Sequence, residues 1–521
     1  MILLISVPLD FLSSLRRRQW FRQFDLLKPL SLQSRDQVFF LLLSYPLFSA
    51  IDLLKMDLSP RTIRVQSSPL LEHRPSITLD EEEEIRRLAP NVWKPNEWEE
   101  LRAWWSLVWP SMLLSFTGML QSFVDLSFLG HYRTHKYTPA DHLAAASIAS
   151  MIFEISMAIF TKGIFQALTI LCSHAYGAGN YKLMGIWLQI CLLSCCVLAI
   201  PLICLWWNAA SILNQTIGLS ENLHDLVDVF SRYSALRIYP MFISGAVSKI
   251  CLAQKIIKPF VFISLSSVIC NLILNQVFIY GIGDWNGFGF KGSPLANAAT
   301  ATVSCALTLI YTFVYRRDVR KRCWPGYGGI TRGKIEAFLR QSMPQTVAIC
   351  LEDFNMQTIS VFAIQLSHTY GDWVVAANNG LLTFFLTLTA FQQGTMNGTS
   401  VRVGHFIGAQ NEAGAKMVMR LSLKVALGVG SIISACLLAG RHILPRIYTS
   451  DPQILEETAT LMIPVGITYI ALAIFFISMA TLDAQGRPEV VAISFFVGAW
   501  LVCIPTAYVL AFVCVSSVYR P

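Results

Sequence analysis

The sequence has few charged residues. Asp, Glu, Lys and Arg make up 14% of its 521 residues, whereas they make up about 25% of a typical soluble domain. Because charges are sparse, apolar runs recur from Trp104 to the C-terminus, and the mean hydropathy is +0.53. Each run has about 20 residues, which is the length that crosses a bilayer as a helix. So many runs cannot share one soluble core, and we expect a polytopic membrane protein.

The sequence also lacks the patterns that enzymes and nucleic-acid-binding proteins use. Its cysteines show no disulfide or zinc spacing, and it contains no phosphate-binding loop and no nucleophile–base motif. The net charge is +8, but the Lys and Arg residues stand at the ends of apolar runs, as they do in short cytoplasmic loops. We therefore expect no enzyme and no nucleic-acid partner, but a chain embedded in the lipid bilayer.

Eleven apolar spans are expected, in two sets on either side of the basic loop 316–334. The predicted fold class is all-α, with an N-lobe in residues 101–322 and a C-lobe in residues 335–521. Residues 1–100 differ in composition and are expected to form an N-terminal extension that is largely cytoplasmic or interfacial. The expected spans are 104–130, 142–172, 184–207, 223–252, 259–281, 294–315, 335–366, 374–401, 418–444, 454–482 and 490–515.

The two sets of spans are repeats of one unit. The turn Gly177-Ala178-Gly179-Asn180 recurs as Gly408-Ala409-Gln410-Asn411, and Ala253-Gln254 recurs at the same offset as Ala484-Gln485. Pro110 and Pro344, early in the first and seventh spans, are separated by nearly the same interval. With six spans per unit, both units enter the membrane from the same side. The prediction is a pair of parallel six-helix lobes, a layout found among transporters.

The repeat also predicts a twelfth span, because the sixth span, 294–315, would recur beyond Pro521. We expect either a truncated or mis-bounded gene product or an eleven-span protein with its C-terminus outside. The Lys and Arg residues are concentrated in the loops on one side. Basic short loops stay in the cytoplasm, which places the N-terminus there.

Four stretches carry a family resemblance, and they recur in the expected order from about Trp104 to the C-terminus. They are 171–180 continuing to 185–189, Ala253-Gln254 with Pro259, Cys350-Leu351-Glu352, and 400–404 with Gly408-Ala409. These stretches resemble the multidrug and toxic compound extrusion (MATE) family, particularly its eukaryotic branch. The resemblance implies two six-helix lobes that form a V, and efflux of drugs or metabolites driven by inward flow of H⁺ or Na⁺. It implies no cofactor apart from this coupling ion.

Acidic residues within the spans are candidates for a coupling site, because a charge inside a membrane is costly and usually functional. Glu352 lies in the seventh span. Asp353 follows it about 100° around the helix, so we expect at most one of the two to face the centre of a cavity. Glu352 matches the acidic position of the family in this span, which is similar to a proton- or cation-binding site.

The N-lobe offers further candidates. Asp125 in the first span resembles the aspartate that bacterial members use for coupling. Asn271 and Asn275 lie one turn apart on one face of the fifth span. Many bacterial relatives pair an asparagine with an aspartate at this spacing, so Asn275 weakens a proton site here. In the second span, Glu154 is a candidate to line the cavity, and we expect Lys162 to lie near the inner end of the helix.

The C-lobe departs from the family pattern. Mammalian members carry further acids, and their counterparts here are Gln357, Thr383 and about Leu472. Without these charges there is less reason to expect high affinity for organic cations, and a more neutral or anionic substrate stays open. Gln357 stays a candidate for substrate binding. Candidates for an aromatic and soft wall of the cavity are Met356, Phe354, Phe384, Phe385 and Phe391, although apolar stripes in membrane helices more often contact lipid or neighbouring helices.

The predicted function is export of small organic compounds, xenobiotics or metabolites, in exchange for H⁺ or Na⁺ by alternating access. The expected protein is a monomer in the plasma membrane or in a vacuolar or vesicular membrane. Two alternatives stay open. One is a flippase for a lipid-linked precursor, which would need a basic cavity that faces lipid. The other is a transport-inactive, truncated homologue.

Overall fold

The computed structural model describes residues 96–514 apart from 134–135, 219, 325, 327–328, 371–372 and 448–451. Most of the predicted N-terminal extension therefore lies outside the described residues. Within them the chain is helical, and a single isolated bridge between Ile282 and Trp285 is the one β interaction. The all-α prediction is confirmed.

The N-lobe contains six long helical segments, each of which coincides with an expected span to within a few residues. Four of them include short turns of π-helix or 3₁₀-helix, which lie in the middle of two segments and at the ends of the other two. The segments are α4 (Glu97–His131), α5–η3–α6 (Pro139–Gly177), α7 (Tyr181–Trp207), α9–η4–α10 (Glu221–Ala253), α11–η5 (Lys258–Tyr280) and η6–α12–η7 (Gly289–Tyr315). The short helices are α8 (Ala209–Ile217) and α13 (Arg317–Cys323).

The C-lobe contains five long segments among the described residues, again in the expected order. The predicted ninth span ends at Gly440 instead of residue 444, because a turn at Arg441 and His442 follows it. The eighth continues to Gly408 past its predicted end at 401. The segments are α14 (Arg332–Tyr370), α15 (Trp373–Gly408), α16 (Glu412–Gly440), α17 (Pro452–Ala484) and α18–η9–α19–η10 (Pro488–Cys514), with η8 (Leu444–Ile447) between α16 and α17.

Nine helical segments of the described chain are long and apolar enough to cross a membrane. α14 and α15, of 39 and 36 residues, are the two other long helices. α14 carries Glu352, Asp353, Asn355 and Gln357 within one stretch, and this polar content lowers its hydropathy. Polar residues within a membrane span usually face the interior of the protein or a water-filled cavity. The polar stretch of α14 is therefore expected to face away from lipid.

The repeat seen in the sequence extends to the backbone. Asn180 caps α7 by accepting from the backbone N–H of Leu183, and its counterpart Asn411 caps α16 in the same way at Gly414. The turns before these caps contain left-handed residues at matching positions, Gly179 with φ 72° and Gln410 with φ 57°. A second matching pair is Lys255 with φ 63° and Gly486 with φ 71°. The two lobes are thus copies of one unit, each with the same turns.

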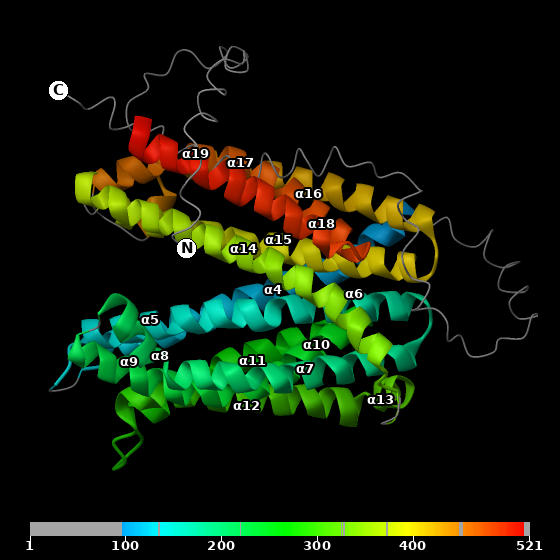
Figure 1. The fold of residues 1–521 in the computed structure, drawn as a ribbon, viewed down its shortest axis with the longest axis horizontal. Coiled ribbons are helices and arrows are strands. Elements are labelled where there is room, and N and C mark those ends of the chain that lie inside the picture. Colours follow the sequence, from blue (N-terminus) through cyan, green and yellow to red (C-terminus); the bar gives the residue numbers. More distant parts are fainter. Residues whose placement is uncertain are drawn as a thin grey trace, which may run out of the picture.

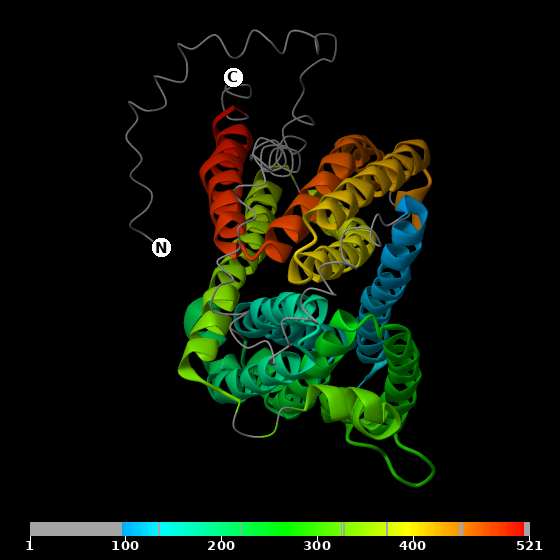
Figure 2. The same ribbon diagram turned by 90° about the vertical axis from the view of Figure 1, so that its right-hand side faces the viewer.

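The two lobes lie one above the other and are linked by helices that cross between them (Figure 1). Figure 2 shows that α4 and α14, the first helix of each lobe, both run from one lobe to the other. α4 packs against α15, and α14 packs against α6. In Figure 1 the lobes are closest at the right-hand end, where α6 and α15 end, and they diverge toward the left.

Glycines make the two crossing contacts close. A Cβ on Gly163 of α6 would clash with the backbone of Thr346 in α14, and a Cβ on Gly394 of α15 would clash with Met112 in α4. The two glycines occupy the same position of the repeat, so the same close approach is built twice. The first helices also carry large buried anchors at matching positions: Trp104 of α4 packs in the C-lobe, and Phe338 of α14 packs against Trp187 in the N-lobe.

Candidate functional site

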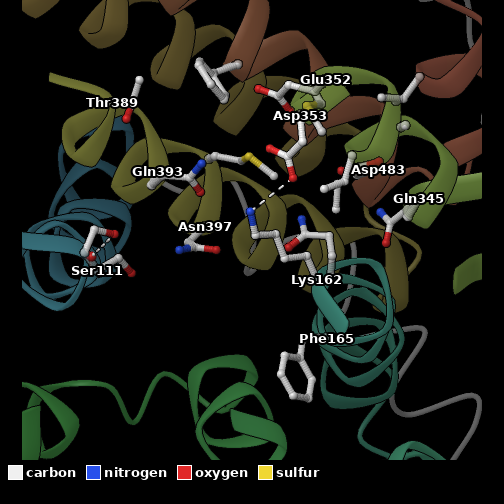
Figure 3. Close-up of a pocket in the computed structure, with 18 of the residues that line it drawn as sticks. Ser111, Lys162, Phe165, Gln345, Glu352, Asp353, Thr389, Gln393, Asn397 and Asp483 are labelled. Atoms are coloured by element: carbon white, nitrogen blue, oxygen red, sulfur yellow. Dashed lines mark hydrogen bonds and ion pairs between the residues drawn. The ribbon is translucent and has the colours of Figure 1, made fainter. Parts of the chain in front are cut away.

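A cavity of about 790 Å³ lies between the lobes and is lined from both. α4, α5, η3, α6, α10 and α11 contribute from the N-lobe, and α14, α15, α17 and α18 from the C-lobe. Figure 3 shows Glu352, Asp353 and Asp483 on the C-lobe side and Lys162 and Phe165 on the N-lobe side. The volume falls within the range of roughly 300–1,000 Å³ that is typical of small-molecule pockets.

Glu352 and Asp353 of α14 both line this cavity. The expectation that at most one of them would face it is wrong, because the cavity is wide enough to include side chains about 100° apart on the helix. Nζ of Lys162 lies 3.3 Å from Oδ2 of Asp353 (Figure 3). The pair joins the N-lobe to the C-lobe across the cavity.

Lys162 is also placed differently from the prediction. It ends the π-helical turn η3 (Ala158–Lys162) in the middle of the second long segment, and the 15 residues of α6 still follow it before the segment ends at Gly177. A π-helical turn widens the helix locally and is frequent at functional sites. The lysine therefore lies inside the membrane span, with its charge compensated by Asp353.

The remaining predicted residues of the cavity divide into two groups. Glu154, Gln357 and Met356 line it, and so does Leu472. Phe354 is 41% exposed and Phe391 is buried, and neither lines the cavity, in line with the expectation that apolar stripes more often contact lipid or neighbouring helices. The side chains of Thr383, Phe384 and Phe385 lie outside the described residues. The aromatic residues that do line the cavity are Phe165, Phe260, Phe475 and Phe476.

Asp125, Asn271 and Asn275 form a separate cluster within the N-lobe. Nδ2 of Asn275 donates to Oδ1 of Asp125 (2.9 Å) and to Oδ1 of Asn271 (3.1 Å). Nδ2 of Asn271 in turn donates to Oδ1 of Asn297 (3.0 Å). Both asparagines of α11 have no exposed surface. The cluster joins α4, α11 and α12, and none of its members lines the cavity.

Arg237 is a charge that the sequence analysis did not single out. It lies in η4, within the fourth long segment, and its guanidinium carbon stands 3.4 Å from the ring centre of Phe153. Asp125 and Glu154 both interact with it electrostatically. An arginine placed within a span usually pairs with intramembrane acids, so Arg237 offsets the negative charge of these two carboxyl groups.

Asp483 was likewise missed. It is a fully buried residue of α17 that lines the cavity, and neither of its carboxylate oxygens has a hydrogen-bond partner among the described residues. The amide groups of Gln345 and Gln166 face it, and Figure 3 shows Gln345 beside it. Comparison of the two repeats would have identified Asp483, because the equivalent residue of the first repeat is Leu252, which carries no charge. A charge in one repeat where the other has an apolar residue marks a position with a special environment.

The lobes are joined at one end by two matching hydrogen bonds. Nε2 of His174 in α6 donates to the carbonyl oxygen of Ala484 (2.7 Å), and Nε2 of His405 in α15 donates to the carbonyl oxygen of Ala253 (2.7 Å). Each bond crosses from one lobe to the other. The two histidines occupy equivalent positions of the repeat, as do the two alanines, so an approximate two-fold axis passes through this contact.

Glycines of the repeated turn let the two helix ends meet. A Cβ on Gly177 would clash with the carbonyl group of His405, and a Cβ on Gly408 would clash with that of His174. The repeated turns therefore let the ends of α6 and α15 pack closely. We call this contact between the ends of α6 and α15 the closed end of the cavity.

A buried ion pair reinforces the closed end. Nε and Nη2 of Arg402 in α15 donate to the two carboxylate oxygens of Glu100 in α4 (2.6 and 2.5 Å). Their side chains are 6% and 3% exposed. Arg402 follows the predicted eighth span, but it lies within α15, which extends beyond that span.

Comparison with known proteins agrees with this architecture. The family model MatE matches residues 110–277 and again residues 344–509, once in each lobe. An uncharacterized transporter of Schizosaccharomyces pombe is 26% identical over 83% of this chain and 79% of its own length. Multidrug and toxin extrusion protein 1 of Danio rerio is 24% identical over 82% of this chain and 69% of its own length.

Solved structures show the same fold. The crystal structure of a eukaryotic MATE transporter superposes with a TM-score of 0.65 at 19% identity, covering 80% of this chain and 90% of that one. The family model covers more than half of the chain, and its two matches begin at Pro110 and Pro344, the prolines that mark the repeat. Both lobes, the cavity between them and the repeated turns therefore identify this multi-pass membrane protein as a transporter of the MATE family, not an enzyme.

Proposed function

We propose that this protein exports small organic compounds in exchange for H⁺, or for Na⁺, by alternating access. The observation that carries the proposal is the position of Glu352, a carboxyl group in a cavity between two lobes that are closed at one end. A carboxyl group away from bulk water binds a proton more readily than one in water. Its charge therefore depends on which side of the membrane the cavity faces.

The proposed cycle follows from this dependence. With the closed end toward the cytoplasm, the cavity receives protons from outside and releases the exported compound. When Glu352 is neutral, the cost of enclosing it between the lobes falls, so the lobes can rock about α4 and α14 and open the other end. Loss of the proton to the cytoplasm and binding of a new compound return the protein to its first state.

The driving force is sufficient. One proton that crosses ~100 mV provides about 2.3 kcal/mol, and a difference of one pH unit adds about 1.4 kcal/mol. Together they sustain a concentration ratio of roughly 500-fold, at about 1.36 kcal/mol per factor of ten. One titrating carboxyl group is therefore enough for useful export, and no cofactor apart from the coupling ion is needed.

The Asp125 cluster is a second place where a coupling ion could act, but two features disfavour it. Its carboxylate already accepts a hydrogen bond from Asn275, and Arg237 compensates its charge electrostatically. We assign proton binding to Glu352 and a structural role, holding α4 against α11, to Asp125.

The same charges bear on the alternatives. A flippase for a lipid-linked precursor needs a basic cavity to hold phosphate groups, whereas here the acids Glu154, Glu352, Asp353 and Asp483 outnumber Lys162 and Lys249. A transport-inactive homologue stays open to test by transport itself. We propose that the protein acts as a monomer with a cytoplasmic N-terminus, in the plasma membrane or a vacuolar or vesicular membrane.

The test uses the full chain in proteoliposomes, with a pH jump imposed across the bilayer and counterflow of a fluorescent organic substrate measured. Glu352→Gln keeps the shape of the side chain but cannot titrate, so we expect it to lose most of the pH-driven transport. A Na⁺ gradient at equal pH replaces the pH jump in a second arm. This arm decides between the two ions.

Glu336→Gln is the matched control, because Glu336 is an exposed residue of the same helix outside the cavity. It should transport like the parent. Equal pH-driven transport by Glu352→Gln and the parent would overturn the assignment of the coupling site. Absence of transport by the parent with every compound and both gradients would favour the transport-inactive alternative.

A further inference from the structure

The charges that line the cavity can be sorted by whether another group of the protein already compensates them. Lys162 and Asp353 form an ion pair at 3.3 Å. Glu154 interacts electrostatically with Arg237. Glu352 is the group that carries the coupling proton in the proposed cycle, and it is neutral when that proton is bound. The charged residues of the lining that are left over are Lys249 and Asp483.

Lys249 belongs to the N-lobe and has no counter-ion among the described residues. It lies in α10, and its Nζ makes neither a hydrogen bond nor an ion pair with any residue that the structure describes. The equivalent position of the other repeat is Ala480, which carries no charge. A lysine in a membrane span without a partner is costly, which is the sign of a group whose partner comes from outside the protein.

Asp483 belongs to the C-lobe, and no ion pair of the described chain includes it. It has no exposed surface, and both of its oxygens lack a donor in hydrogen-bonding geometry within the described chain. Gln345, 3% exposed, lines the cavity beside it, and both polar atoms of its side chain also lack a partner there. Buried polar groups in proteins nearly always have hydrogen-bond partners. A buried carboxylate and a buried amide that lack them within the described chain therefore indicate a binding site for a ligand.

The two groups do not satisfy each other. Opposite charges that pair directly lie within about 4 Å, and no ion pair of the described chain joins Lys249 to Asp483. They come from opposite lobes and face one cavity, so a compound lying between them would contact both. The apolar part of such a compound would have Phe165, Phe260, Phe475 and Phe476 as walls.

We propose that Lys249 and Asp483 select zwitterionic compounds, in which one small molecule carries both an acidic group and a protonated amine. The acidic group binds the ammonium of Lys249. The amine donates to the carboxylate of Asp483 and to the side-chain oxygen of Gln345. This inference rests on the proposed export function and names the class of substrate. It also agrees with the loss of acids at Gln357 and Leu472, since a zwitterion needs fewer negative groups than an organic cation.

The test is equilibrium binding to the full chain in lipid nanodiscs at neutral pH, with a matched set of probes that share one naphthyl ring. The probes are naphthylalanine and a γ-amino acid with the same ring (zwitterions), naphthylethylamine (cation), naphthylpropanoate (anion) and naphthylethanol (neutral). We expect the parent to bind one of the zwitterions about 10-fold or more tightly than each of the other three, the range expected for a charged hydrogen bond.

The variants separate the two charges. Lys249→Gln should bind the zwitterion no more tightly than the cation, and Asp483→Asn should bind it no more tightly than the anion. Lys249→Arg and Asp483→Glu keep the charges and should keep the preference. Glu336→Gln is the matched control, because Glu336 is an exposed residue of α14 outside the cavity. If Asp483→Asn does not fold, Gln345→Leu gives the second measurement, with a smaller loss for both zwitterion and cation.

Three results would overturn the proposal. One is equal binding of all probes by the parent, and another is a preference for zwitterions that survives in both Lys249→Gln and Asp483→Asn. The third is an equal loss for charged and neutral probes in Asp483→Asn, which would make Asp483 a proton site instead. Because binding is measured without a gradient, failure here is distinct from failure of export, which the pH-jump assay reports.

Discussion

Arg402 and Glu100 form the most deeply buried ion pair of the described chain, with side chains 6% and 3% exposed. Both hydrogen bonds between them are charge-assisted, and the planar guanidinium matches the carboxylate in a two-point contact. Neither residue stands out in the sequence, because Glu100 lies in a polar stretch before the first span and Arg402 follows the eighth. Their contribution to the fold depends on α4 and α15 meeting.

Removing one partner alone should be much worse than removing both. Glu100→Gln leaves the Arg402 guanidinium buried without a counter-charge, so we expect the free energy of unfolding to fall by about 3–5 kcal/mol. Glu100→Leu combined with Arg402→Met should recover most of this loss, because no unpaired charge stays buried. Unfolding in detergent, followed by tryptophan fluorescence, measures both variants. A double variant as unstable as Glu100→Gln would contradict this account.

At the scale of elements, close contacts between the lobes are made by glycines on α6 and α15 that face α14 and α4. Gly163 and Gly394 stand at the same position of the repeat, and each lies so close to the facing helix that a Cβ would clash. Small residues at such points let helix backbones approach in a membrane, where van der Waals packing drives helix association. Each first helix can therefore pack closely against the second helix of the other lobe because glycine has no side chain at the point of contact.

Adding bulk at these glycines should push the helices apart. We expect Gly163→Val and Gly394→Val each to lower the free energy of unfolding by about 1–3 kcal/mol, the usual cost of overpacking. Gly118→Ala in α4 is the control, because a Cβ there meets nothing within 4 Å. Alanine also favours helix over glycine. Thermal unfolding of the three variants in one detergent makes the comparison, and equal stability of all three would refute the close-contact argument.

At the scale of the whole molecule, the closed end is held by bonds that occur in symmetric pairs. His174 bonds to Ala484 and His405 bonds to Ala253, each from one lobe to the other. Because the two bonds are related by the repeat, they must break together when the lobes separate at this end. A contact held by a few hydrogen bonds suits a switch. The free energy needed to break it is small enough to be supplied by the binding of one proton and one compound.

Weakening either bond should shift the population toward separated lobes. His174→Leu and His405→Leu each remove one hydrogen bond, worth about 1 kcal/mol, so we expect both to raise the fraction of separated lobes by about fivefold. Spin labels at Lys182 and Gln410, which are exposed on either side of the closed end, report the distance by electron spin resonance.

His131→Leu is the control for this measurement, because His131 bonds within its own helix to Ser127 and lies at the opposite end of α4 from Glu100. It should leave the distance distribution unchanged. The symmetry makes a stricter demand, namely that the two closed-end variants behave alike. A shift in His174→Leu with none in His405→Leu would exclude a closed end in which both bonds act as one unit.

The helices, their order and the duplication could be predicted from the pattern of residues alone. Apolar length specifies a membrane span wherever it occurs, because water is absent and the backbone must form its own hydrogen bonds. The repeated turns could be recognised from matching residues at one sequence offset. The caps at Asn180 and Asn411 are local too, because each side chain accepts a hydrogen bond from a backbone N–H three residues later. Candidate cavity residues with a charge in the middle of a span, such as Glu352, could be picked out because a charge there is costly.

Which charges meet depends on the packing of helices that are far apart in the chain. Lys162 and Asp353 are 191 residues apart, and Glu100 and Arg402 are 302 apart, so no local pattern relates them. Whether Asp125 and Glu352 share a site depended on how the helices of each lobe pack, and they do not. Asp483 and Lys249 stand near the ends of their expected spans. They line the cavity because α10 and α17 both border it, a relation that arises from the packing of one lobe against the other.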